Sequence, residues 1–126
     1  MMTPAETMAA IRDMWQCGRL DEAAAHFAEN GMLLVEPDRQ AVGRAAIGDG
    51  FGELARRLRF LVVEDRLVIP RGNIALHHAR WAARYMIDGV ASKEEINGIT
   101  ADVLVLQADG RWLAVVNPWG GDVLEG

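Results

Sequence analysis

The 126-residue chain is poor in cysteine, tyrosine and histidine, with one, one and three of these residues. Its only cysteine, Cys17, excludes a disulfide bond within the chain and is compatible with a reducing compartment. No apolar run approaches the roughly 18 residues that a membrane span requires. The N-terminus also lacks the basic stretch and unbroken apolar segment of a signal peptide. These absences predict a cytoplasmic protein that does not insert into membranes.

Positive charge is also scarce, because 13 Lys and Arg residues stand against 18 Asp and Glu residues. The resulting net charge of −5 argues against a nucleic-acid partner, whose binding depends on neutralising phosphates. Neighbouring His77 and His78 point to opposite faces of a strand, and His26 is the only other histidine, so we expect no metal site. The glycine-rich run 48–52 lacks the dinucleotide-binding spacing, so we expect no cofactor.

The first half of the chain carries helix signals. Thr3-Pro4-Ala5-Glu6 has the order of a capping box, with a hydroxyl N-cap and a glutamate three residues later. Gly48, Gly50 and Gly52 lie inside a later helical pattern and each costs about 1 kcal/mol relative to alanine. That cost indicates close backbone approach or an irregular helix. The expected helices are 3–18, about 21–28 and 44–58, with a brief strand at 32–35.

From Arg59 onward the chain is rich in Val, Ile, Leu and Trp and is broken by turn signals. Strands this close in sequence pair as antiparallel hairpins, because parallel pairing needs a crossover of a dozen or more residues. The order therefore predicts a single α+β domain over residues 1–126, with N-terminal helices packed on a curved antiparallel sheet. The expected strands are Arg59–Ile69, Ile74–Ile87, Glu95–Gln107 and Arg111–Asn117.

Several short stretches have a familiar order and spacing. They are Gly18-Arg19-Leu20-Asp21, His26-Phe27-Ala28-Glu29-Asn30, Gly43-Arg44-Ala45-Ala46-Ile47 and, most specifically, the block from Thr100 through Asp109-Gly110-Arg111-Trp112 to Asn117-Pro118-Trp119-Gly120. Together they resemble the nuclear transport factor 2-like superfamily, particularly its SnoaL-like and ketosteroid isomerase-like branch. The resemblance spans nearly the whole chain. It implies a cone-shaped, cystatin-like roll with an open-ended pocket, and commonly a homodimer packed through the sheet.

The last hairpin allows a register to be predicted. If Asp109-Gly110 is a two-residue turn, counting outward places a row of side chains on one side of the sheet. Asp102 and Asn117 would then lie opposite each other at the end of an apolar stripe, about 5 Å apart at Cβ, and Thr100 and Trp119 would extend the row. The expected facing pairs are Leu106 with Leu113, Leu104 with Val115, and Asp102 with Asn117.

Asp102 is the main candidate for chemistry. Burial disfavours an ionised carboxylate, so an Asp102 in an apolar pocket could be protonated near neutral pH and donate a hydrogen bond. The resemblance also aligns Asp102 with the aspartate that similar isomerases use in this way. The alternative is a structural aspartate, hydrogen-bonded to Asn117 or to the backbone.

A general base has two candidates. Glu36, before Pro37, resembles the position of the isomerase base with one residue of slippage, although a glutamate beside a proline is also a common solvent-exposed loop residue. His77 shares one face of its strand with Trp81, and it could act as a base near pH 7. The sequence leaves open whether this face or that of His78 and Arg80 lines the pocket.

The resemblance would also require a phenol, which the sequence lacks at that place. The only tyrosine, Tyr85, is on another element, and Trp15 occupies the relevant region of the first helix. Asn30 stands where many relatives carry aspartate. The side chains expected to line the pocket are Trp15, Trp81, Leu104, Val115, Asn117 and Trp119.

Two functions remain. The first is a homodimeric protein that binds a small apolar ligand, as an acid–base isomerase, cyclase or dehydratase acting on a carbonyl-bearing compound, with Asp102, Glu36 and His77 as its catalytic groups. The second is a non-catalytic association domain with a vestigial pocket. Glu36 would discriminate between them, because it must share a cavity with Asp102 to serve as the base.

Overall fold

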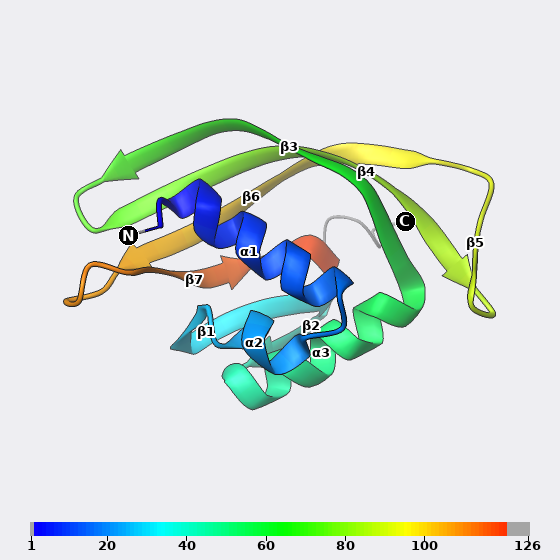
Figure 1. Cartoon of the computed structure of the whole chain (residues 1–126), viewed down its shortest axis with the longest axis horizontal. Coiled ribbons are helices and arrows are strands. Elements are labelled where there is room, and N and C mark those ends of the chain that lie inside the picture. Colours follow the sequence, from blue (N-terminus) through cyan, green and yellow to red (C-terminus); the bar gives the residue numbers. More distant parts are fainter. Residues whose placement is uncertain (1, 121–126) are drawn as a thin grey trace.

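A strongly curved sheet wraps over a layer of helices in the computed structural model, which describes residues 2–120 (Figure 1). Helix α1 lies along the concave side of the sheet, α3 packs against β1 and β2, and α2 packs against α3. The helices are α1 (Pro4–Gln16), α2 (Leu20–Ala24) and α3 (Arg44–Arg57). The strands are β1 (Phe27–Glu36), β2 (Arg39–Val42), β3 (Leu58–Arg71), β4 (Ile74–Ile87), β5 (Val90–Ala91), β6 (Ile96–Leu106) and β7 (Trp112–Asn117).

The sheet has the order β2-β1-β7-β6-β4-β3, and β5 pairs with β4. The predicted antiparallel meander runs through β3, β4, β6 and β7. The first strand, β1, adds to β7 in parallel, so the sheet is mixed. The predicted α+β fold, with N-terminal helices packed on a curved sheet, is confirmed.

Local signals set α1 as predicted. The Thr3 backbone N–H donates to Glu6 Oε1 at 2.9 Å, and the Glu6 N–H donates to Thr3 Oγ1 at 3.2 Å. This reciprocal pair is a capping box. Met8, Ile11 and Trp15 of this helix are buried against the sheet.

The second predicted helix is wrong beyond its first turn. Helix α2 ends at Ala24, and Phe27 already belongs to β1, opposite Ala114 of β7. The backbone N–H of Ala114 also donates to His26 O at 3.0 Å. Pairing with a strand far along the chain therefore overrides the local helical pattern over residues 25–28.

Aromatic side chains fill the space between α1 and the concave face of the sheet. Trp119 lies 5.7 Å from Trp15 and 5.5 Å from Phe60, ring centroid to ring centroid, and Phe60 lies 6.1 Å from Trp81. The Trp15 indole N–H donates to the backbone oxygen of Phe51 at 2.9 Å. Three tryptophans expected to line a pocket therefore pack against a shared aromatic core.

In the part of the chain that the structure describes, none of the helices has the length and apolar character needed to cross a bilayer.

Candidate functional site

The β6–β7 hairpin is one residue longer at its tip than predicted. The Gln107 N–H donates to Arg111 O at 2.7 Å, and the Gly110 N–H donates to Gln107 O at 3.0 Å, which makes a three-residue loop. Gly110 has a φ of +88°, the left-handed conformation that such a loop requires. The predicted two-residue turn is therefore wrong, and Leu106 lies opposite Trp112 instead of Leu113.

A bulge in β7 then cancels this shift. Leu104 pairs with Ala114 and Val103 pairs with Val116, so Val115 is the extra residue on its strand. The predicted pair of Leu104 with Val115 is wrong. One step beyond the pair Val103–Val116, counting brings Asp102 level with Asn117, as expected from the sequence. Both side chains are buried, with exposed fractions of 1% and 0%.

Asn117 does not take the hydrogen-bonding role predicted for it. Its Oδ1 accepts the backbone N–H of Trp119 at 3.0 Å, and its amide nitrogen has no hydrogen-bond partner among residues 2–120. Asp102 instead bonds across the other side of β6, where His77 of β4 lies directly opposite. The Asp102 Oδ2 is 3.1 Å from His77 Nδ1.

The structure answers which face of β4 turns inward. His77 and Trp81 are buried on the concave side, with exposed fractions of 2% and 5%, whereas Arg80 is exposed on the convex side. Cross-strand neighbours share a face, so Asp102 also points to the concave side.

A third group, Asp65 of β3, completes a row across three neighbouring strands. Its Oδ1 lies 2.6 Å from His77 Nε2, and 52% of its side chain is exposed. The register of β3 shifts between Asp65 and Leu67, and such a bulge re-aims side chains beside it. Asp65 was not predicted as a site residue. The sequence feature that could have indicated Asp65 is the charged triplet Glu64-Asp65-Arg66, which interrupts a mainly apolar strand.

Both contacts of His77 are hydrogen bonds at the same time only when the row of Asp65, His77 and Asp102 holds one proton more than a neutral imidazole with two carboxylates. Two hydrogen bonds need two protons, and a neutral imidazole carries only one, so the second resides on the histidine or on a carboxyl group. Burial alone would lower the pKa of His77, but its hydrogen bonds to Asp102 and Asp65 and the negative charges of both outweigh it, so this pKa is raised. The row has one buried end, Asp102, and one exposed end, Asp65.

Glu36 lies in a different environment. Its Oε1 is 2.7 Å from Arg57 Nη1 and its Oε2 is 3.5 Å from Arg39 Nε. The hydrogen bond from Arg57, followed by that from Arg39, lowers the pKa of Glu36 and so weakens it as a base. Among the described residues its partners are these arginines, and neither Asp102 nor His77 contacts it.

A cleft of about 310 Å³ lies between α1 and the edge strand β3. Val63 pairs with Trp81 and Asp65 with Ala79, so both β3 residues face inward. Along a strand two residues span roughly 7 Å, so Asp65, which does not itself line the cleft, lies about that far along β3 from Val63. The cleft is lined by Arg12, Gln16, Phe60, Val62 and Val63.

With this geometry in hand, solved structures identify the fold. An NTF2-like protein with a cystatin-like fold from Novosphingobium aromaticivorans has a TM-score of 0.60 at 18% identity, over 88% of this chain and 74% of its own. A ketosteroid isomerase-like protein from Erwinia carotovora atroseptica reaches 0.66 at 16%, over 87% and 86%. A protein from Catenulispora acidiphila, solved in complex with S-DNPA, reaches 0.67 at 22%, over 89% and 85%. The chain has the NTF2-like, cystatin-like fold.

This confirms, at the level of the fold, the resemblance predicted from the sequence. No family model matches the chain, and no curated protein matches it. At identities below 25% the structural similarity establishes the fold alone and no activity.

Within this NTF2-like fold, the side chains predicted to line the pocket divide into two groups. Trp15, Trp81, Leu104, Asn117 and Trp119 are buried in the interior. Val115 instead lines a groove on the other side of the sheet. The indole nitrogen of Trp81 and the amide nitrogen of Asn117 have no hydrogen-bond partner within residues 2–120.

The described residues contain no group of three or more His, Cys, Asp or Glu side chains placed to hold a metal ion.

Proposed function

We propose that the protein is an acid–base enzyme that acts on a small apolar compound carrying a carbonyl group, bound in the cleft between α1 and β3. One observation carries this proposal. Both ring nitrogens of the buried His77 are hydrogen-bonded to carboxylates, and one of these, Asp65, is half exposed on the same face of β3 as the cleft residue Val63, two residues along the strand. Perturbed, buried titratable groups next to a cleft are common at functional sites.

In this proposal Asp65 is the catalytic residue that exchanges a proton with the substrate. A general base must lie within hydrogen-bond reach of the proton it takes, and Asp65 is the exposed member of the row. His77 passes the proton inward or returns it. Asp102 is a positioning residue, because it holds the imidazole through Nδ1 and stabilises its charged form.

The cleft supports an apolar substrate with a polar group near Arg12. Phe60, Val62 and Val63 supply an apolar wall, and Arg12 and Gln16 supply hydrogen-bond donors from α1. A guanidinium beside a carbonyl oxygen stabilises the negative charge that develops when an adjacent carbon loses a proton. The cleft volume of about 310 Å³ is at the lower end for ligand sites, which indicates a small compound.

The test measures proton transfer without requiring the natural substrate. Apolar ketones, such as phenyl ketones and cyclic enones, are incubated with the protein in D₂O, and loss of the proton next to the carbonyl is followed by NMR. The wild type should catalyse exchange for at least one ketone. Asp65→Asn should lower the rate by about 10²- to 10⁴-fold, the usual contribution of general acid–base catalysis.

Asp109→Asn is the matched control, because Asp109 is an exposed aspartate at the β6–β7 loop whose partner is Arg111. It should exchange at the wild-type rate. Equal rates for Asp65→Asn and the wild type would remove Asp65 from the mechanism. Exchange no faster than in buffer, across the whole panel, would remove the enzymatic proposal.

Self-association through the sheet is a second candidate function. The convex face carries exposed apolar side chains on neighbouring strands: Val62, Leu67 and Ile69 of β3 and Ile99 of β6. This face is opposite to the one that holds His77, but Val62 also lines the cleft, so a homodimer formed through the convex face would cover one edge of the cleft. Contiguous exposed apolar patches commonly mark protein interfaces.

A further inference from the structure

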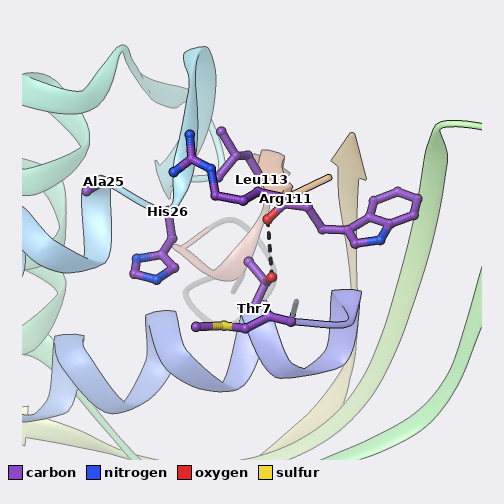
Figure 2. Close-up of a pocket in the computed structure, with 7 residues that line it drawn as sticks. Thr7, Ala25, His26, Arg111 and Leu113 are labelled. Carbon is purple, nitrogen blue, oxygen red and sulfur yellow. Dashed lines mark hydrogen bonds between the residues drawn. The ribbon is translucent and has the colours of Figure 1, made fainter. Parts of the chain in front are cut away.

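A second cavity, of about 290 Å³, lies where the start of α1, the end of α2 and the start of β7 meet (Figure 2). It shares no residue with the cleft between α1 and β3. Its lining is Met2, Thr7, Ala25, His26, Arg111, Trp112 and Leu113.

Two hydrogen bonds between distant segments hold this cavity open. Thr7 Oγ1 donates to Trp112 O at 3.2 Å, which ties α1 to the start of β7 (Figure 2). The Ala114 N–H donates to His26 O at 3.0 Å, which ties the α2–β1 connection to the same strand. The walls are therefore fixed in the absence of a ligand, and a preformed site binds without the cost of ordering its walls.

The cavity combines an apolar interior with a cationic group at its edge. Met2, Ala25 and Leu113 contribute apolar surface, and Arg111 brings a guanidinium. Asp109 accepts from Arg111 Nε at 2.8 Å, which fixes the near end of the guanidinium. The two terminal amino groups of Arg111 bond to no other side chain in the described part of the structure, so they remain available for a planar anion.

His26 has a fixed orientation in the opposite wall. Its Nδ1 lies 2.9 Å from the backbone oxygen of Glu22, and because a carbonyl only accepts, Nδ1 carries the hydrogen. The ring edge with Nε2 is then the polar edge left for a ligand or for water.

Beyond Arg111 the surface becomes polar. A shallow groove of about 670 Å³ shares Arg111 and Leu113 with the cavity and adds Arg44, Asn30 and Gln107, with Glu29 as its carboxylate. Arg111 thus stands where an apolar cavity meets a polar groove. A ligand that satisfies both must have an apolar body and an anionic head.

We propose that this cavity binds a small amphipathic monocarboxylate, with its carboxylate on Arg111 and its apolar body against Ala25 and Leu113. An apolar cavity of about 150 Å³ suffices for benzene. A space of about 290 Å³ therefore holds an aliphatic or aromatic body of about eight carbons. This site is separate from the proposed catalytic row, so either proposal stands if the other fails.

Calorimetric titration with octanoate tests the proposal, with 1-octanol as the neutral probe of the same length. The wild type should bind octanoate saturably and 1-octanol at least about tenfold more weakly, because a charge-assisted hydrogen bond typically contributes 1.5–3 kcal/mol. Arg111→Gln should weaken octanoate about tenfold or more. Arg71→Gln, a matched change at an exposed arginine of β3, should leave it unchanged. The net charge of −5 disfavours unspecific uptake of an anion.

Two further variants locate the bound octanoate. Ala25→Leu adds side-chain volume to the cavity wall and should abolish binding, whereas Asp65→Asn should bind as the wild type does. The proposal is overturned if octanoate does not bind at millimolar concentration, if octanoate and 1-octanol bind equally, or if Arg111→Gln and Arg71→Gln have the same effect. Loss of binding in Asp65→Asn would assign octanoate to the cleft and would also overturn it.

Discussion

Two glycines of α3, Gly48 and Gly50, should respond in opposite directions to replacement by alanine. Both lie inside the helix and neither has a positive φ, so alanine should stabilise each position by about 1 kcal/mol through helix propensity. Their surroundings differ. A Cβ at position 48 would meet Asp21 Oδ1 at 3.4 Å, an ordinary contact, whereas one at position 50 would meet Val35 Cγ2 at 2.9 Å and Leu33 Cδ2 at 3.1 Å.

The magnitude follows from this difference. Leu33 and Val35 belong to β1 and are buried in the core, so neither can move aside freely. Inserting a methyl group into such packing costs about 1–3 kcal/mol. Because the propensity gain is the same at both positions, the overpacking cost is also the expected difference between the variants. Gly48→Ala should be about 1 kcal/mol more stable than the wild type, and Gly50→Ala about 0–2 kcal/mol less stable.

Equilibrium unfolding in urea measures both values, with the m-value checked for a change in the unfolded state. Each variant controls for the other, since the chemical change, the helix and the assay are identical. Two free energies of unfolding that agree within about 0.5 kcal/mol would refute the close packing of α3 on β1. Such a result would mean that the glycines of α3 have no packing role.

Two further predictions concern the row and the convex face. The pKa of His77 is raised in the folded protein, so above the unfolded pKa of about 6.5 the folded state binds more protons than the unfolded state. The contribution of His77 to the free energy of unfolding should therefore be complete below pH about 6.5 and should be lost as the pH rises through the folded pKa. The slope of this loss is at most about 1.4 kcal/mol per pH unit. Urea unfolding between pH 5.5 and 8.5 should show this loss in the wild type and not in His77→Gln, and equal slopes would contradict it. Sedimentation at micromolar concentration should give a dimer for the wild type and a monomer for Ile99→Glu, since Ile99 is exposed on the convex face; a monomeric wild type would exclude association through the sheet.

Local chemistry made some elements predictable from the sequence. The capping box of Thr3 and Glu6 fixes the start of α1. Strand β4 has the predicted bounds, Ile74–Ile87, because turn residues with positive φ flank it: Gly72 at +62° before it, and Asp88 at +50° after it. At these places the backbone conformation is decided by neighbours in the chain.

Elsewhere the deciding contacts are distant in sequence. Residues 27 and 28 look helical locally, but Phe27 pairs with Ala114, and this parallel contact draws the segment into β1. The alignment of Asp102 with Asn117 was predicted correctly, but from a two-residue turn that the structure does not have. The hairpin loop is one residue longer than predicted, and the bulge at Val115 takes up one residue on the same strand. The longer loop and the bulge shift the register in opposite directions, so the predicted register is restored at Asp102 and Asn117.

The site itself was only partly predictable. Alternation along β4 grouped His77 with Trp81, but burial in the fold was needed to show that this face turns inward. Asp65 could not be assigned from alternation, because β3 shifts register at two places before residue 67. Each shift reverses the face on which the following residues lie, and no turn signal in the sequence marks either one.

The inward carboxylate of Asp65 has one competing explanation that concerns folding alone. Strand β3 is an edge strand, and proteins protect such edges with bulges and with inward-pointing charges that prevent pairing with another chain. That explanation accounts for a bulge and a charge at position 65. It does not require that the charge be placed 2.6 Å from Nε2 of a buried histidine whose Nδ1 already has a carboxylate partner. A carboxylate that contacts only water would protect the edge equally well. The contact of Asp65 with His77 adds a desolvation cost and does not protect the edge further. The geometry of the row therefore favours proton transfer, and the exchange rate of Asp65→Asn separates the two explanations.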